Sequence, residues 1–312
     1  MTRYIVRRLL QMVLVFFGAT FLLFAALYLL PGDPTQALGS DRTLAPATVQ
    51  AIRARYHLDD PVYVQYATYI KDIARGDLGT SIQLRRPVSQ IMRDSIPWSV
   101  KLALSATAVE IILGIGSGVI SAIKRYSFLD TLSTVSTSVL IAIPVFWLGL
   151  MLQILFGLKF RGTFLGLPIS GVTDGWKSYV LPSITLASAV TAVTARLTRT
   201  TMLEVMRQDY VRTASAKGLS RRAVVFKHAL RNALIPVVTN IGLDFGTLIG
   251  GAILTETVYA WPGVGRQVYF AIIAHDNPVI IGSTIVFVFA FMIVNLIVDI
   301  SYAVLDPRIR YV

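Results

Sequence analysis

The chain has 312 residues, of which 54% are hydrophobic and 15% are charged, and it contains no cysteine. The lack of cysteine excludes disulfide bonds, thiolate metal sites and a cysteine nucleophile. Soluble domains carry roughly 25% charged residues, so this composition, with a mean hydropathy of +0.65, indicates an integral membrane protein. The net charge of +12 is also typical of nucleic-acid binding, but the placement of the charges favours the positive-inside rule.

Six apolar segments are long enough to cross the hydrocarbon core as helices, which takes about 20 residues each. They are residues 9–30, 101–123, 132–158, 180–203, 233–258 and 280–305. The expected fold class is therefore all-α: a polytopic membrane protein with about six transmembrane helices, forming one domain over residues 1–312.

The first segment is expected to be a retained helix. It follows a basic start, as a signal peptide does, but it is too long for one and ends in Pro31-Gly32-Asp33-Pro34 instead of a small-residue cleavage site. Its N-terminus is then cytoplasmic, and alternation places 124–131, 204–232 and the C-terminal tail on the same side. Segment 204–232 carries seven basic residues, Arg207, Arg212, Lys217, Arg221, Arg222, Lys227 and Arg231.

The long connection 31–100 is expected to form an external lateral segment near the membrane surface. Residues 46–57 and 62–75 have the mixed apolar and polar spacing of short amphipathic helices, and Gly76 is a helix stop. Pro87 and Pro97 mark the return to the membrane.

The stretch Gln208–Pro236 predicts a helix–glycine–helix arrangement. Asp209 is expected to cap a first helix that runs through Lys217, and Gly218 to end it, because a left-handed residue costs glycine least. Ser220 is expected to cap a second helix that runs to about Asn232. From physics alone, such a basic helix pair suits either a lipid surface or a protein partner.

Four acidic residues fall within the apolar segments, where charge is costly and usually faces a protein interior or a cavity. Glu110 and Asp244 lie deep, and both a translocation path and local pairing remain open for them. Glu256 and Asp299 lie near predicted helix ends, which favours local pairing or an interfacial position. The three histidines, His57, His228 and His275, are dispersed over three loops, so no metal site is expected.

Catalytic and nucleotide-binding motifs are missing from the sequence. It has no P-loop, no His-Glu-x-x-His and no Gly-x-Ser-x-Gly. Gly114, Gly116 and Gly118 lie inside an apolar segment with no preceding strand, so they predict close helix packing and not a dinucleotide site. The chain is therefore expected to be no enzyme and to hold no cofactor.

Several short motifs, in this order and at these positions along the predicted topology, resemble one transporter family. They are Leu30-Pro31-Gly32-Asp33-Pro34, Gly76-Asp77-Leu78-Gly79, Leu181-Pro182-Ser183-Ile184-Thr185-Leu186, Tyr210-Val211-Arg212-Thr213-Ala214, Ala216-Lys217-Gly218-Leu219, Leu230-Arg231-Asn232-Ala233-Leu234-Ile235-Pro236, Trp261-Pro262-Gly263-Val264-Gly265 and Leu305-Asp306-Pro307-Arg308-Ile309-Arg310-Tyr311. The chain resembles, over essentially its whole length, the first permease of dipeptide, oligopeptide and nickel ABC importers. Arg212-Thr213-Ala214 stands where the general coupling-loop pattern has Glu-Ala-Ala, and this departure is itself similar to the peptide branch.

The resemblance implies a type I ABC importer permease fold in the cytoplasmic (inner) membrane, with both termini cytoplasmic. It implies that 210–232 docks on cytoplasmic ATPases, which bind the ATP and Mg²⁺. The expected coupling residues are Asp209, Tyr210, Arg212, Thr213, Ala214, Lys217, Gly218, Leu219, Ser220 and Arg221.

The partners that the family implies are a homologous second permease, two ATPases and an extracytoplasmic binding protein that delivers cargo. External segments 31–100, 159–179 and 259–279 are expected to contact that binding protein. Peptide is the expected cargo, with glutathione and nickel as alternatives within the family. A secondary transporter driven by an ion gradient stays open as another class, which would show inverted repeats and broken midplane helices.

Overall fold

A computed structural model describes residues 2–28, 59–163 and 165–305, together with the isolated positions 46, 50 and 54. Within these residues every regular element is a helix, apart from one bridge between Thr80 and Pro87. The all-α prediction is confirmed. By their contacts the described residues fall into two units: unit 1 holds those within 1–99 and 262–293, and unit 2 holds those within 100–261 and 294–305.

Five of the described helical stretches are long and apolar enough to cross a membrane, and a bent pair supplies a sixth span if it is counted as one. The five are Val6–Ala25, Val88–Ile123, Lys177–Val205, Arg221–Gly251 and Asn277–Val298. About six spans were expected, in agreement with this set.

The segment expected to cross as one helix over 132–158 is bent. It consists of α7 (Phe128–Ala142) and a second helical stretch, Val145–Lys159, that meet at an angle of 108°. Pro144 explains the break, because a proline disfavours the helical conformation of the residue before it. Ile143 accordingly has the extended angles φ −82° and ψ 127°.

Unit 1 contains α1 (Thr2–Tyr28), α4 (Val62–Ala74), the first part of α5 (Val88–Val109), α14 (Val264–Ile273) and the first part of α15 (Asn277–Leu305). Helix α4 is the amphipathic helix expected over 62–75, and Gly76, with φ +76°, follows its end. Tyr66 of α4 contacts the rings of Phe21 and Phe24 in α1. Of the other expected helix, 46–57, the structure describes only positions 46, 50 and 54.

Helix α5 begins earlier than the predicted span and continues through Pro97. An interior proline removes one backbone hydrogen bond. The turns on either side of it are held by the buried side chains of Met92 and Leu102, and this packing keeps the helix continuous.

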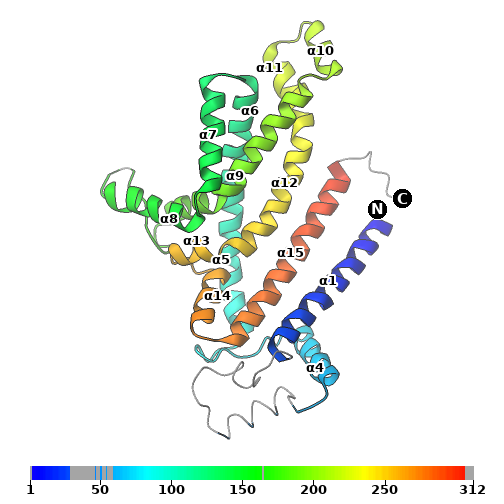
Figure 1. Ribbon diagram of the computed structural model, residues 1–312, viewed down its shortest axis with the longest axis vertical. Coiled ribbons are helices and arrows are strands. Elements are labelled where there is room, and N and C mark those ends of the chain that lie inside the picture. Colours follow the sequence, from blue (N-terminus) through cyan, green and yellow to red (C-terminus); the bar gives the residue numbers. More distant parts are fainter. Residues whose placement is uncertain are drawn as a thin grey trace. The chain divides into compact units, whose positions relative to one another are not determined.

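Unit 2 is built around α9 (Lys177–Val205), which packs against α6, α7, α8 and α12 (Figure 1). Its other elements are η1 (Glu110–Ile115, a π-helical stretch), α6 (Gly116–Ile123), α8 (Val145–Leu152), η2 (Gln153–Lys159), α10 (Asp209–Ala216), α11 (Arg221–Ala223), η3 (Val224–Ala229), α12 (Leu230–Gly251) and α13 (Ile253–Val258).

Two of the three glycines in the Gly114–Gly118 run bring this helix close to α9. A Cβ added at Gly118 would lie 2.5 Å from the carbonyl oxygen of Ala195, and one at Gly114 would lie 2.9 Å from Thr194 Cγ2. A Cβ at Gly116 would meet nothing within 4 Å. The expected close packing is therefore present at Gly114 and Gly118, whereas Gly116 takes no part in it.

These glycines provide a matched test of the packing. Gly118→Ala should lower the free energy of unfolding by about 1–3 kcal/mol, because the methyl group overlaps the α9 backbone, which cannot rotate away. Gly116→Ala should leave stability unchanged or slightly raised. Thermal unfolding of the purified protein in detergent measures both, and an equal loss in the two variants would contradict this account of the α6–α9 contact.

Candidate functional site

After α9 the chain forms the short helix α10 and then, past a glycine, the start of a second helix, so the helix–glycine–helix order is as the sequence predicts. Helix α10 ends at Ala216, with Lys217 as its C-cap, and Gly218 follows with φ +77°. The next helix begins at Arg221, where the Ser220 Oγ accepts a hydrogen bond from the Ala223 amide at 3.3 Å. Gly218 and Ser220 thus have the stop and cap roles expected of them.

Two local expectations were wrong. Gln208, and not Asp209, is the N-cap of α10, and no side chain caps this helix. Asp209 lies in the first turn, where its charge still suits the helix dipole. The second helix also does not stop near Asn232. It continues through η3 into α12, so that Arg221–Gly251 is one apolar helical stretch.

The inner face of α10 is apolar and packs on the start of this long helix. Val211 and Ala214 form a buried cluster with Val224 of η3, and Val205 at the end of α9 packs beside them. Ala214 is only 6% exposed, so it fixes α10 in place and offers no surface to a partner.

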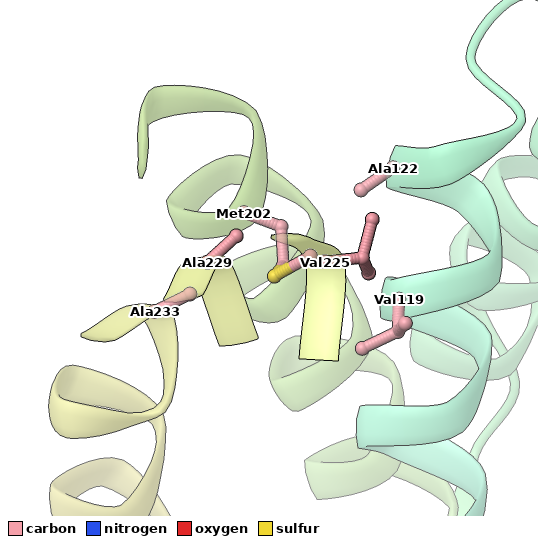
Figure 2. Close-up of a cluster of buried hydrophobic side chains, with 6 residues drawn as sticks. All are labelled: Val119, Ala122, Met202, Val225, Ala229 and Ala233. Atoms are coloured by element: carbon pink, nitrogen blue, oxygen red, sulfur yellow. The ribbon is translucent and has the colours of Figure 1, made fainter. Parts of the chain in front are cut away.

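A second buried cluster joins the segment to the body of unit 2. Val225 and Ala229 of η3, with Ala233 of α12, lie against Met202 of α9 and against α6 through Val119 and Ala122 (Figure 2). Met202 and Ala229 have no exposed surface. Four elements therefore meet at a close-packed junction directly below the helix–glycine–helix segment.

The remaining residues of the segment form an exposed surface. Exposed are Asp209, Tyr210, Arg212, Thr213, Lys217, Gly218, Leu219, Ser220 and Arg221, which are nine of the ten residues expected to couple to a partner. The Tyr210 side chain is fixed against α12, since its hydroxyl accepts a 3.0 Å hydrogen bond from Asn232 Nδ2. The surface mixes basic side chains with large apolar ones, because Leu219 and Tyr210 are each 44% exposed.

Beside this surface lies an open depression of about 510 Å³ that the sequence did not reveal as a site. Its lining residues are Ser220, Arg222, Ala223, Phe226 and Lys227. Phe226 is 52% exposed, whereas its neighbour Val225 is buried in the junction. An aromatic ring within a strongly basic segment is the signal that could have pointed to it, since exposed aromatic residues mark protein contacts.

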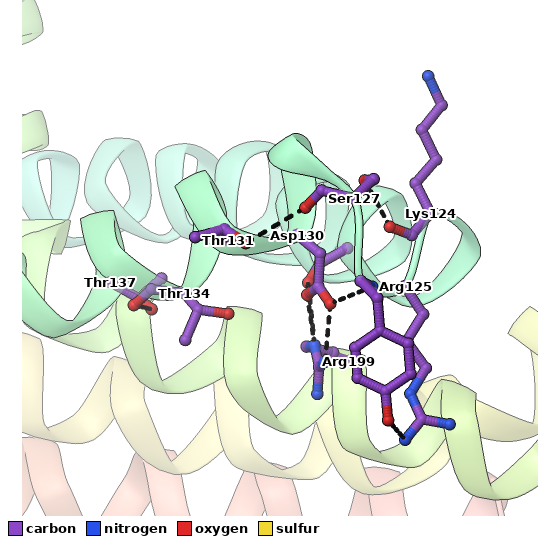
Figure 3. Close-up of polar contacts among 10 residues, drawn as sticks. Lys124, Arg125, Ser127, Asp130, Thr131, Thr134, Thr137 and Arg199 are labelled. Atoms are coloured by element: carbon purple, nitrogen blue, oxygen red, sulfur yellow. Dashed lines mark hydrogen bonds and ion pairs between the residues drawn. The ribbon is translucent and has the colours of Figure 1, made fainter.

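A buried ion pair lies within unit 2, and no sequence pattern predicts it. Arg199 of α9 makes a two-pronged contact with Asp130 of α7, with Nε–Oδ1 and Nη2–Oδ2 distances of 2.8 and 2.9 Å. Asp130 also accepts hydrogen bonds from the Ser121 hydroxyl and the Tyr126 amide (Figure 3). Its side chain is 5% exposed and that of Arg199 is 29% exposed.

Glu110 and Asp244, the deep acidic residues, come together within unit 2. Glu110 is fully buried in η1 and accepts a 2.7 Å hydrogen bond from the Thr194 hydroxyl. Asp244 of α12 accepts a 2.6 Å hydrogen bond from Asn240 and lies close enough to interact electrostatically with Glu110. The two carboxyl groups therefore form one polar cluster on the faces of η1, α9 and α12.

The other acidic and histidine candidates do not join this cluster. Glu256 is fully buried in α13, while the Asp299 side chain and His57 lie outside the described residues. His228 lies in η3 and His275 in the turn after α14. Among the residues that the structure describes, no group of three or more His, Cys, Asp or Glu side chains could hold a metal ion.

Comparison with known proteins gives a consistent result. The family described as binding-protein-dependent transport system inner membrane component matches residues 114–311, and its N-terminal part matches residues 1–103. A dipeptide transport system permease protein of Alkalihalophilus pseudofirmus is 38% identical over 334 aligned positions. A glutathione transport system permease protein of Escherichia coli K12 is 39% identical over 311 positions, and both matches cover 100% of each chain.

A solved structure agrees with the fold. The inward-facing MetNI methionine ABC transporter is 16% identical and has a TM-score of 0.57, covering 70% of this chain and 97% of that chain. At this identity the match shows the fold alone.

The ion pair of Asp130 and Arg199 generates a stability prediction. Asp130→Asn should lower the free energy of unfolding by about 2–4 kcal/mol, because it leaves the Arg199 guanidinium partly buried without its counter-charge. Asp94→Asn is the matched control, since Asp94 pairs with Arg86 at an exposed site and should cause no measurable change. Thermal unfolding in detergent measures the stability of both variants. An equal change in the two would contradict a stabilising role for the buried ion pair.

Proposed function

Because the chain belongs to the family of binding-protein-dependent transport system inner membrane components, we propose that it is one permease subunit of an ATP-driven importer for dipeptides and oligopeptides. It would form half of the translocation pathway. The second half would come from a homologous permease, and two ATPase subunits would bind the ATP and Mg²⁺. A binding protein on the opposite side of the membrane would deliver the cargo.

The proposed orientation puts the α10–α11 segment and both termini in the cytoplasm. The basis is charge: the exposed side chains of Arg207, Arg212, Lys217, Arg221 and Arg222 lie in this one segment, and basic residues collect on the cytoplasmic side. The external surfaces then include the loop after α4 and the turns around α14, where the binding protein would dock.

Coupling to the ATPases is proposed to pass through the exposed surface of residues 209–221 and the adjoining depression. The observation that carries the proposal is the unbroken helical stretch Arg221–Gly251. A docked partner that moves α11 would also move the start of α12, because both belong to one continuous helical stretch. Helix α10 would follow, because Val211 and Ala214 pack on Val224. The junction around Met202 passes the same displacement to α6 and α9 as a rigid-body motion.

Shape is expected to dominate over charge in this docking. Exposed ion pairs contribute little each, because water screens them and long side chains lose freedom. Phe226 and Leu219 can instead bury apolar surface in a groove of the ATPase, with the surrounding basic residues setting register.

Peptide is the cargo that we propose, on the basis of the dipeptide permease relative, and glutathione is the alternative favoured by the second relative. Glu110 and Asp244 are proposed to border the path, since they place polar groups among membrane-spanning helices. Specificity among peptides would reside largely in the binding protein.

A substitution at Gly218 tests the coupling. Gly218→Val should abolish binding-protein-stimulated ATP hydrolysis and uptake, because a β-branched residue is strained at φ +77° and will change the angle between α10 and α11. Gly218→Asn should keep much of the activity, since asparagine tolerates this conformation. Both are measured in proteoliposomes holding the full complex, and normal uptake by Gly218→Val would refute the proposed coupling.

The depression gives a separate prediction. Phe226→Ala should leave the thermal stability of the chain unchanged but weaken retention of the ATPases by about 1–3 kcal/mol, the range typical of an aromatic anchor. Val225→Ala should instead lower the thermal stability of the chain and leave retention of the ATPases unchanged. Val225 is 3% exposed within the junction, and its truncation opens a cavity. Copurification with the ATPases and thermal unfolding are the two readouts, and a stability loss in Phe226→Ala would remove the docking role.

A further inference from the structure

Arg196 is a charged residue inside a membrane-spanning helix that none of the features above explains. It is the twentieth of the 29 residues of α9, nine residues before the end of the helix at Val205. Ala192, Ala195 and Thr198 around it are buried within unit 2, whereas Arg196 is exposed. The helix therefore presents one cation on its uncovered side, level with its closely packed core.

The guanidinium of Arg196 lies deep along the helix axis. Its Nη2 donates a 3.3 Å hydrogen bond to the carbonyl oxygen of Thr137. Thr137 is nine residues beyond Phe128, the first residue of α7, which corresponds to about 14 Å of helix. The side chain therefore does not reach back to the end of its helix, as lysine and arginine near a membrane surface do.

The contrast with Arg199, one turn further on, is informative. Arg199 is neutralised by Asp130, whereas no carboxylate in the part of the chain that the structure describes forms an ion pair with Arg196. The bond to Thr137 uses one of the five N–H donors of the guanidinium. No hydrogen bond among the described residues occupies the remaining donors, so they are open to a group from outside this part of the chain.

The surface next to Arg196 is polar as well. Thr134 and Ser138, which lie about one turn apart on α7 beside the buried Thr137, are exposed (Thr134 and Thr137 are labelled in Figure 3). Both the Thr137 and Ser138 hydroxyls bond to the Thr134 carbonyl oxygen, at 3.0 and 2.9 Å. A cation beside a row of hydroxyl groups is unsuited to lipid, and such intramembrane residues face a protein interior or a water-filled cavity.

We infer that Arg196 lines the translocation path and binds a carboxylate group of the cargo as it passes between the two permeases. This inference rests on the proposed function. A guanidinium suits a carboxylate, which it can hold through two parallel hydrogen bonds. Every peptide with a free C-terminus carries such a group, and glutathione carries two. A divalent metal ion as cargo would be repelled at this position, so Arg196 favours an anionic or zwitterionic cargo.

The absence of cysteine in the chain allows a test by charge replacement. In proteoliposomes with the second permease, the ATPases and a binding protein loaded with dialanine, Arg196→Cys should lower uptake by about 10- to 100-fold, the factor expected for a lost charge-assisted hydrogen bond. Treatment with 2-aminoethyl methanethiosulfonate, which adds an ammonium group to the thiol, should restore much of the uptake. The 2-sulfonatoethyl reagent, which adds an anion, should not.

Lys124→Cys is the matched control, because Lys124 is an exposed cation in the turn after α6, and neither the substitution nor either reagent should change uptake. Wild-type complex treated with both reagents corrects for thiols on the partner subunits. Uptake by Arg196→Cys at the wild-type level, or equal recovery with both reagents, would overturn the inference.

A second arm tests the carboxylate directly. In the complex without the binding protein, the wild-type chain should bind radiolabelled dialanine more tightly than dialanine amide, which has no carboxylate, and Arg196→Cys should abolish that difference. Equal binding of the two compounds by the wild-type complex, or a difference that persists in Arg196→Cys, would overturn the carboxylate contact. If Arg196→Cys no longer copurifies with the second permease, then Arg196 pairs with an acidic residue of that subunit, and the inference is likewise overturned.

The proposed function fails in a different way. In that case the wild-type complex would take up neither dialanine nor glutathione when ATP is supplied, whatever residue stands at position 196. Ready modification of the cysteine at 196 by the water-soluble reagents would then still support a water-filled path beside α9.

Discussion

The close approach of α6 to α9 is the constraint on which the rest of unit 2 depends. In a membrane, helices gain little from hiding apolar surface, so they associate by fitting tightly and by pairing polar groups. Gly114 and Gly118 permit the fit, and the α9 backbone fills the space that their missing side chains leave. Once this contact is made, Thr194 reaches Glu110 and Arg199 reaches Asp130, so the buried polar pairs are consequences of the same packing.

The junction around Met202 extends this arrangement toward the exposed surface of residues 209–221. Three of its six buried residues, Ala122, Ala229 and Ala233, have small side chains. These small side chains allow four elements to pack closely. Val225 and Phe226 are neighbours in sequence, yet one faces the junction and the other faces the surface. Along η3 the side chains of Val224, Val225 and Ala229 are buried, whereas those of Phe226 and Lys227 are exposed, so one short segment is firmly held on one side and open on the other.

The sequence was sufficient for the features that depend on local chemistry. Apolar length predicts the spans, and Gly218 and Ser220 predict the glycine break and the helix cap, because Gly218 acts through its own backbone and the Ser220 hydroxyl bonds an amide three residues away. The features that it missed depend on distant partners. Asp130 and Arg199 are 69 residues apart, and no periodicity relates them. The exposure of Phe226 is equally invisible, since it depends on which face η3 turns to α9. Ala214 was expected at the surface because motif similarity does not say which members of a motif hold the helix in place.

The π-helical stretch η3 has a consequence for how this region tolerates change. A π turn contains one residue more than an α turn, and each residue of an α-helix advances about 100° around its axis. The extra residue therefore sets the rotational phase of α11 relative to α12. Loss of a single residue between Val224 and Ala229 would return the stretch to regular helix and turn the exposed surface of α10 and α11 by roughly a quarter of a circle, with every other side chain still in the sequence. Substitutions here act on one contact at a time, whereas a one-residue deletion would redirect the whole surface, so the length of η3 is under tighter restraint than its composition.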